Sequence, residues 1–238
     1  EVGVLDVDPT SPFSGGAVLG DRVRMQDWVL DPGVFVRSMA SRGHLGGLSA
    51  AAPKALTLLD AAGFAYLLIE TVGVGQDEVE IVRTADTTIV ALTPGWGDGI
   101  QAAKAGILEI GDVFAVNKAD RPGVDDTIRD LKTMLAMGPE RPWTPPIIPT
   151  IGASGEGIDE LWDAIDGHRR HLVESGGLDE GRRDRRVGEL EVALASVFAR
   201  RAESLAKDPA GRELVARVER GELDPWSAAE ELIAVPER

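Results

Sequence analysis

The fold class of this 238-residue chain is decided by the stretch Val113-Phe114-Ala115-Val116-Asn117-Lys118-Ala119-Asp120. Its first four residues form a continuous apolar run, which is typical of a strand buried on both faces of a parallel sheet. The polar residues behind that strand suit guanine. An Asn can bond the N7 edge of the base, a carboxylate two residues beyond the Lys can accept both N1–H and N2–H, and the Lys stem can lie along the ring. Adenine offers no such pair of donors, so Asn117, Lys118 and Asp120 are predicted to select guanine.

Apolar runs of strand length alternate with amphipathic helical patterns on both sides of this stretch. Such alternation predicts an α/β fold with a mostly parallel sheet covered by helices on both faces. Ligands of such sheets bind at the carboxyl ends of the strands, which is where the polar stretches of this chain fall. The predicted strands are 2–7, 34–37, 65–69, 87–92, 113–116 and 146–150. The predicted helices are 51–62, 77–84, 99–109, 125–137, 158–174 and 187–206, with a last helix that opens after Asp224 and extends through Ile233.

A second polar stretch follows the strand predicted at 65–69 and reads Glu70-Thr71-Val72-Gly73-Val74-Gly75-Gln76. An acid followed three positions later by Gly is the layout of a Walker B strand that leads into a phosphate-sensing loop. The acid can hold Mg²⁺, usually through water, and the Gly73 amide can approach a γ-phosphate because no side chain blocks it. A loop containing Gly152 and Ala153 follows the strand at 146–150 and can cover the guanine from its other side.

Two further carboxylates lie on loops near the start of the chain, Asp8 before Pro9 and Asp21 at the end of the Gly-rich run 15–21. Taken singly, each is explained equally well as a turn or capping residue. Carboxylates repel phosphates, so as members of a nucleotide site they make sense beside a metal ion. The same two interpretations apply to Glu70.

In their order and spacing, these motifs resemble the MeaB/ArgK-type G-protein chaperones of adenosylcobalamin-dependent acyl-CoA mutases, which carry the older label of LAO/AO transport system ATPase or kinase. The resemblance extends from residue 1 to about residue 175, and beyond that it rests on a charged helical tail. The matching stretches are 7–11, 15–22, 43–47, 70–76, 97–101, 104–107 and 117–120.

The resemblance implies a Mg²⁺-dependent GTPase that serves as a chaperone of methylmalonyl-CoA mutase in cofactor loading, protection and reactivation. It further implies a nucleotide-responsive switch that contacts the mutase, although the switch residues also fit the first turn of an ordinary exposed helix. The implied site residues are catalytic Glu70, Gly73 and Gln76; Mg²⁺-binding Asp8, Asp21 and Glu70; nucleotide-binding Asn117, Lys118, Asp120, Gly152 and Ala153; and partner-contacting Asp98, Gln101 and Lys104.

The chain departs from the family pattern at its phosphate site. No G-x-x-x-x-G-K-[ST] motif occurs in it, and none of its five lysines follows a Gly. The family carries this P-loop one strand and one helix before the position of Val2, and residue 1 is Glu rather than Met. We therefore expect that the N-terminal P-loop segment is absent from this chain, which alone would hydrolyse GTP hardly at all, whereas the intact protein would be active. A smaller departure is Ile151, where the family usually has Ser.

A boundary is predicted near residue 175, with a G domain at 1–175 and a C-terminal helical arm at 176–238. The resemblance implies that the arm dimerises. Within it, Leu190, Ala193, Leu194 and Phe198 form an apolar stripe at helical spacing, which needs a cover. A second copy of the chain is one such cover, and packing against the G domain is the alternative.

The composition excludes several classes of function. A net charge of −15 repels a phosphate backbone and argues against nucleic-acid binding. The absence of Cys excludes disulfides and thiolate metal sites and suits a reducing compartment, so we expect a cytoplasmic protein. No apolar run reaches the roughly 18 residues that a membrane span needs.

Two other functions stay open at this stage. The first is an ATP-dependent kinase or ATPase linked to basic amino-acid transport, against which the predicted guanine residues argue. The second is a scaffold that binds the mutase without nucleotide turnover, which the absence of a P-loop favours. A comparison of GTP with ATP binding separates the first of these from a GTPase.

Overall fold

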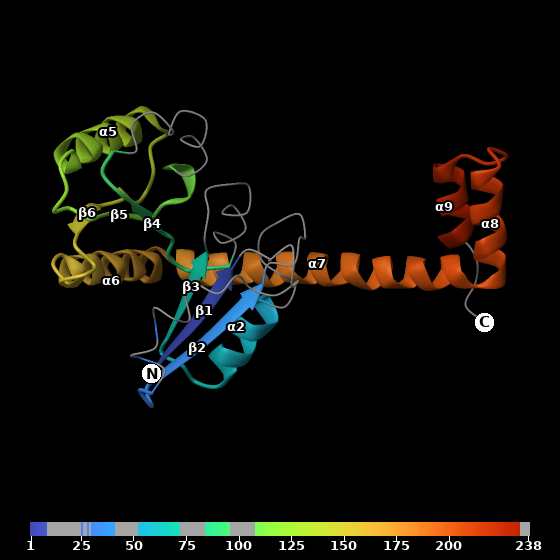
Figure 1. Cartoon of the computed structure of the whole chain (residues 1–238), viewed down its shortest axis with the longest axis horizontal. Coiled ribbons are helices and arrows are strands. Elements are labelled where there is room, and N and C mark those ends of the chain that lie inside the picture. Colours follow the sequence, from blue (N-terminus) through green and yellow to red (C-terminus); the bar gives the residue numbers. More distant parts are fainter. Residues whose placement is uncertain are drawn as a thin grey trace. The chain divides into compact units, whose positions relative to one another are not determined.

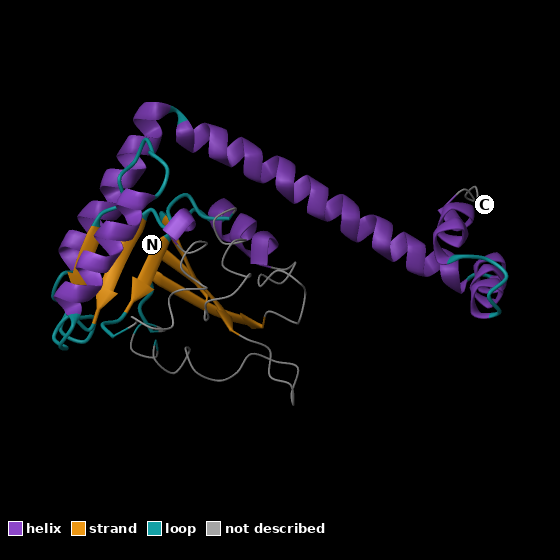
Figure 2. Cartoon of the chain, turned by 90° about the horizontal axis from the view of Figure 1, so that it is seen from above, coloured by secondary structure: helices purple, strands orange, loops and turns teal. Residues whose placement is uncertain are grey.

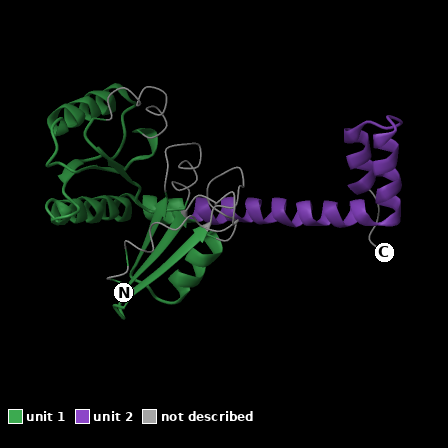
Figure 3. Cartoon of the chain, viewed as in Figure 1, with its two compact units in different colours: residues 1–182 green, residues 183–238 purple. Residues whose placement is uncertain are grey.

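The computed structural model covers the whole chain and describes residues 1–8, 25, 28, 30–40, 52–71, 84–95 and 108–233. The chain divides into two compact units, Glu1–Arg182 and Arg183–Arg238, which are described separately below (Figure 3). The predicted boundary near residue 175 corresponds to the end of a helix, and the two units divide seven residues further on, within the next helix.

The first sheet of unit 1 consists of β1 (Val2–Asp8), β2 (Val34–Ala40) and β3 (Tyr66–Thr71), all parallel and in the order β2-β1-β3 (Figure 1). Helix α2 (Ala52–Ala61) packs on one of its faces, where Leu5 and Val7 meet Ala52 in a buried apolar cluster. Because side chains alternate along a strand, Asp6 lies on the opposite face.

The second sheet of unit 1 consists of β4 (Ile89–Leu92), β5 (Val113–Asn117) and β6 (Ile147–Thr150), again all parallel, with β5 in the centre. Helices α5 (Val124–Met137) and α6 (Ile158–Ser175) cover its opposite faces (Figure 1, Figure 2). Phe114 and Val116 are fully buried against Leu131 of α5. This packing fixes β5 as a central strand and places Asn117 at its carboxyl end.

The predicted α/β class, with parallel strands, helices on both faces and helices at the C-terminus, is confirmed. The described strands form two sheets of three rather than one continuous sheet. Within the described part of the chain, β3 pairs only with β1 and β4 only with β5, so no strand joins the two sheets. The helices predicted at 77–84 and 99–109 fall almost entirely outside the described residues, although 108–110 are helical.

Helix α6 ends at Gly176, whose φ of 78° is the left-handed conformation that favours Gly at a helix end. Helix α7 (Gly177–Lys207) follows directly and has 31 residues, so it begins in unit 1 and continues through unit 2. The sequence predicted a shorter helix from 187 to 206. The extension covers the arginine-rich run 182–186, none of which is buried.

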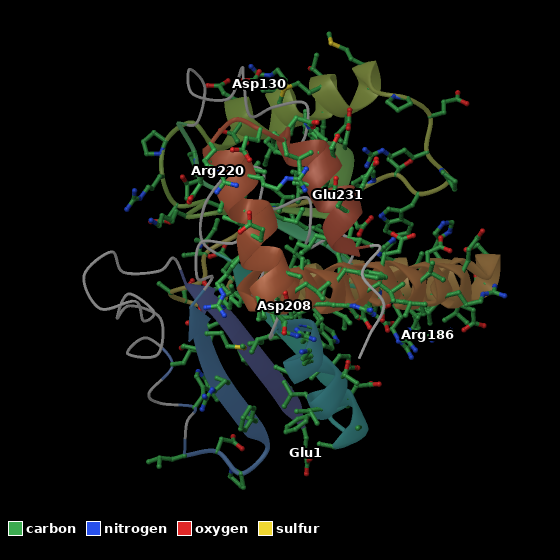
Figure 4. All side chains as sticks on the ribbon, turned by 90° about the vertical axis from the view of Figure 1, so that its right-hand side faces the viewer. Glu1, Asp130, Arg186, Asp208, Arg220 and Glu231 are labelled. Carbon is green, nitrogen blue, oxygen red and sulfur yellow. The ribbon has the colours of Figure 1, made fainter. Side chains whose placement is uncertain are left out.

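Unit 2 ends in two short helices, α8 (Pro209–Glu219) and α9 (Pro225–Ile233). An Asp caps each: Asp208 accepts from the Gly211 amide at 2.7 Å, and Asp224 accepts from the Trp226 and Ser227 amides at 3.0 Å. An ion pair between Arg217 and Glu231 at 3.1 Å joins the two helices; Figure 4 labels Asp208 and Glu231. None of the described helices of either unit is long and apolar enough to cross a membrane.

Candidate guanine nucleotide site

Asn117, at the carboxyl end of β5, is held by its side-chain oxygen. Its Oδ1 accepts hydrogen bonds from the backbone amides of Lys118 at 2.8 Å and Gly152 at 3.0 Å. Two donors on one oxygen fix the amide orientation, because its NH₂ group could not replace that oxygen as an acceptor. Among the described residues no acceptor is bonded to Nδ2, which is therefore the group left to donate to a ligand. A donor is what the N7 atom of guanine requires.

The backbone after Asn117 turns sharply. Lys118 has a φ of 61°, and it is the one described non-Gly residue with a positive φ. A side chain in this left-handed region costs roughly 1–2 kcal/mol. Such strain is characteristic of functional turns. The turn is held by Ala119, whose amide bonds the Thr150 carbonyl of β6 at 3.0 Å, and by Arg121, whose amide bonds the Lys118 carbonyl at 3.0 Å. Lys118 and Asp120 are both exposed at this edge and open to a ligand.

The loop after β6 is organised by its backbone. The Ile151 amide bonds the Glu156 carbonyl at 2.8 Å, and the Ile151 carbonyl accepts from the Ser154 and Gly155 amides. Gly157 closes the loop with a φ of 77°, where a Cβ would collide with the Pro149 carbonyl. Since these bonds use only main-chain groups, Ile151 can occupy the position where Ser is usual in the resembling family. The structure thus brings Gly152 beside Asn117, with Ala153 next along the same exposed loop.

Only some of the predicted metal-binding residues lie in the part of the chain that the structure describes. Glu70 lies in β3, one residue before its carboxyl end, and is half-buried. Asp8 is the last residue of β1, and its side chain is not described. Asp21 lies outside the described residues, as do the predicted residues Gly73, Gln76, Asp98, Gln101 and Lys104.

Asp6 is a carboxylate that the sequence analysis passed over. It is 1% exposed, its Oδ2 accepts from the Ser38 hydroxyl at 2.9 Å, and its Oδ1 has no hydrogen-bond partner. The ladder between β1 and β3 pairs Asp6 with Glu70, so the two acids share one face of the sheet. Adjacent carboxylates with an unpaired buried oxygen fit a nearby hard cation such as Mg²⁺, which binds through oxygen ligands. The signal in the sequence was an acid that interrupts the otherwise apolar run 2–7.

The parallel α/β fold, with an N-K-x-D segment at the carboxyl end of a buried central strand, defines a protein of the GTPase class. Residues 1–206 match the family described as "Methylmalonyl Co-A mutase-associated GTPase MeaB". The chain belongs to this family.

Individual relatives agree with this assignment. A protein of Pyrococcus horikoshii named as a GTPase is 49% identical over 233 residues, which cover 96% of this chain and 73% of that protein. The mouse mitochondrial methylmalonic aciduria type A homolog is 32% identical over 240 residues, covering 97% of this chain and 57% of that protein. The crystal structure of a LAO/AO transport system kinase superposes with a TM-score of 0.64 at 25% identity, covering 97% of this chain and 70% of that one.

Proposed function

We propose that the protein binds GTP with Mg²⁺, that in its intact form it hydrolyses GTP, and that its nucleotide state controls methylmalonyl-CoA mutase as a chaperone of that enzyme. The observation that carries the nucleotide assignment is the fixed Asn117 amide, which offers a donor beside the exposed Asp120 carboxylate. A donor and an acceptor in this order complement the N7, N1–H and N2–H groups of guanine. They do not complement adenine, so the competing ATP-dependent kinase is disfavoured.

The roles proposed for the other residues follow from their positions. Asp8, Asp21 and Glu70 would hold Mg²⁺ and its water ligands, with the buried Asp6 carboxylate beside Glu70. When bound, Mg²⁺ offsets the charge that develops on the transferred phosphoryl group. Gly73 would meet the γ-phosphate, and Gln76 belongs to the same catalytic loop. Water would attack the γ-phosphate in line, and the main contribution of the chain would be to position the water and the phosphates for that attack.

The phosphates also need a cradle of backbone amides and a Lys. Residues 1–238 contain no P-loop motif to supply them. We therefore propose that residues 1–238 by themselves hydrolyse GTP hardly at all.

The chaperone role is tested by linkage between nucleotide and mutase. If the mutase binds one nucleotide state more tightly, it must change nucleotide affinity in return, typically by about 5–150-fold. We expect methylmalonyl-CoA mutase to change the GTP turnover of the intact-length protein, and Asp98→Ala, Gln101→Ala and Lys104→Ala to weaken that response. Steady-state phosphate release with and without the mutase measures it, with ATP as the nucleotide control. A mutase that neither binds nor alters turnover leaves a GTPase without this partner, and binding without any nucleotide effect supports the scaffold instead.

The homodimer proposal rests on the apolar stripe of α7. Leu190, Leu194 and Phe198 are 58%, 47% and 62% exposed, and none of the described residues of α7 is buried. Covering each of these side chains contributes roughly 1.5–3 kcal/mol, so an open stripe favours a partner copy. The double substitution Leu190→Glu and Leu194→Glu is expected to convert a dimer into a monomer of 25.3 kDa by light scattering. A chain ending at Ser175 should also be monomeric. Wild-type chain that is already monomeric at micromolar concentration would end the proposal.

We also place the protein in the cytoplasm. The support for this assignment is the complete absence of Cys from the sequence, which suits a reducing compartment.

A further inference from the structure

A buried histidine lies at the opposite end of the second sheet from the nucleotide residues. His168 of α6 is 4% exposed and faces the residues that precede β4 and β5. Its Nδ1 lies 2.9 Å from the Thr87 hydroxyl, and its Nε2 lies 3.6 Å from Oδ1 of Asp112. The indole of Trp143 packs 5.1 Å from the imidazole, between ring centroids. We name Thr87, Asp112, Trp143 and His168 the His168 cluster.

Asp112 is the centre of the cluster, because two other parts of the chain donate hydrogen bonds to it and His168 lies next to its carboxylate. Its Oδ2 accepts from the Thr88 amide at 2.8 Å, and its backbone carbonyl accepts from Nε1 of Trp143 at 2.8 Å. The cluster therefore ties α6 to the amino ends of both β4 and β5. One residue before Thr87, Asp86 forms an ion pair with Arg182 near the start of α7 at 2.8 Å. Residues 86–88 thus hold the end of α6 and the beginning of α7 in unit 1.

The contacts define the protonation state of the ring. A neutral imidazole has one donor and one acceptor, and the Asp112 carboxylate can only accept. The proton therefore belongs on Nε2, facing Asp112, and the Thr87 hydroxyl donates to Nδ1. A second proton would take this acceptor from Thr87 and put a cation into a buried site. At 3.6 Å, Asp112 is too far to offset that charge with a hydrogen bond.

Burial lowers the pKa of His168 from the ordinary 6.5, the Asp112 carboxylate raises it in part, and nearby His171 lowers it further. Burial likewise raises the pKa of Asp112. The hydrogen bond from the Thr88 amide and the nearby charges of His168 and Arg141 lower it by less. As pH falls, His168 is therefore protonated at a higher pH in the unfolded chain than in the folded chain. The stability contributed by neutral His168 is present above pH 6.5 and is lost as pH falls from there through the folded-state pKa.

A nucleophilic role for this Thr-His-Asp set is excluded by its environment. A catalytic triad must present its hydroxyl and imidazole to a substrate. Here the imidazole is enclosed between Trp143 and the ends of two strands, and Asp112 lies beyond hydrogen-bond distance. The described residues also contain no group of three possible metal ligands, so His168 and Asp112 do not form a metal site with a neighbour.

We propose that the His168 cluster is a proton-sensitive latch, which clamps α6 to the amino ends of β4 and β5 while His168 is neutral and loosens when His168 takes a proton. The latch is independent of the proposed nucleotide and mutase functions. It would make the α6–α7 junction sensitive to mild acid.

The direct test is an NMR titration of the full chain from pH 8 to pH 5 with uniformly ¹⁵N-labelled protein, which reports the histidine rings and the backbone amides together. We expect His168 to keep the Nε2–H tautomer through pH 6.5 and to protonate below it, with the amides of α6 around residue 168 shifting at the same midpoint. The indole Nε1–H of Trp143 provides a second NMR signal, because it donates to the Asp112 carbonyl and its ring packs against the imidazole. Protonation of His168 at or above pH 6.5, or a titration that leaves the α6 amides unchanged, overturns the latch.

Variants separate the latch from general acid sensitivity. His168→Gln keeps a polar, neutral side chain, so its melting temperature should no longer fall between pH 7.5 and 5.5 as that of the wild type does. Asp112→Asn removes the charge that assists protonation, so the histidine midpoint should move to still lower pH. His171→Gln replaces the other histidine of α6. It should keep the acid-dependent fall, but with the midpoint moved to higher pH, because His171 lowers the pKa of His168. Equal pH profiles for His168→Gln and wild type contradict the proposal, and if His168→Gln fails to fold, the wild-type titration decides alone.

Discussion

Asp120→Asn is expected to move nucleotide preference from GTP to xanthosine triphosphate. The Asp120 carboxylate is placed to accept from N1–H and N2–H of guanine, and an Asn leaves one base donor without a partner. A hydrogen bond to a charged group is worth about 1.5–3 kcal/mol, so GTP affinity should fall roughly 10- to 100-fold. The new amide can donate to the 2-oxo group of xanthine, so affinity for xanthosine triphosphate should rise and widen the change in preference.

The substitution is well suited to a binding experiment because Asp120 is exposed. Surface substitutions of this kind usually change stability by less than about 0.5 kcal/mol, so a change in affinity reports the base contact. Both nucleotides should be titrated into the intact-length protein by calorimetry. Asp126→Asn is the matched control, since it makes the same chemical change at an exposed position on α5, where Arg129 is the ion-pair partner of the carboxylate among the described residues. If the Asp120→Asn variant still prefers GTP, Asp120 does not select guanine and the guanine assignment fails.

The position of the Asn117–Asp120 segment at the carboxyl end of a buried strand could be predicted from the sequence because its information is local. A buried strand must be apolar throughout, and the polar residues that follow it fall at the carboxyl edge of the sheet by chain geometry. The same logic placed the loop with Gly152 and Ala153 after a strand at this edge of the sheet, and the structure adds the hydrogen bond from the Gly152 amide to Asn117. Two features of the site depend on tertiary structure and could not be predicted from the sequence. One is that the side-chain oxygen of Asn117, and not its NH₂ group, is used by the protein. The other is the left-handed turn at Lys118, a residue with no special preference for positive φ.

The His168 cluster shows what local patterns cannot reveal. Thr87, Asp112 and His168 are separated by 25 and 56 residues, and each alone looks like an ordinary polar residue near the end of an element. Only the parallel register of β4 and β5 brings Thr88 beside Asp112. Asp6 is a similar case. Its place in a candidate metal site depends on its register partners, Ser38 in β2 and Glu70 in β3, which the sequence alone does not show.

Helix length was misjudged for a different reason. Residues 179–186 are all charged or Gly, so they carry no apolar periodicity, and each Gly costs about 1 kcal/mol in a helix interior. The helix nevertheless runs continuously from Gly177, with long charged side chains between the glycines. Its one clear break is at Gly176, where the backbone is left-handed. The conformation of a Gly depends on its neighbours, which a residue count does not capture.

Asn117→Ala is expected to weaken GTP binding at least tenfold and to destabilise the site as well. The substitution removes the donor to N7, worth roughly 0.5–1.5 kcal/mol, and also the acceptor that serves the Lys118 and Gly152 amides. Losing the second function frees the loop 151–157, so the melting temperature should fall and the remaining base contacts should weaken with it. Affinity by calorimetry and thermal unfolding of the same sample measure the two effects.

The substitution Asn117→Asp separates the loss of the base contact from the loss of loop stability. An Asp retains an oxygen that accepts from the Lys118 and Gly152 amides, so the loop and the melting temperature should stay close to wild type. Its second oxygen, however, replaces the Nδ2 donor and faces the N7 lone pair, so GTP affinity should fall at least as far as in Asn117→Ala. The observed hydrogen bonds require two different results. Asn117→Asp should lose GTP affinity at normal thermal stability, and Asn117→Ala should lose both. If Asn117→Asp binds GTP like the wild type, Asn117 organises the loop without reading the base, and guanine selection must rest on Asp120 alone.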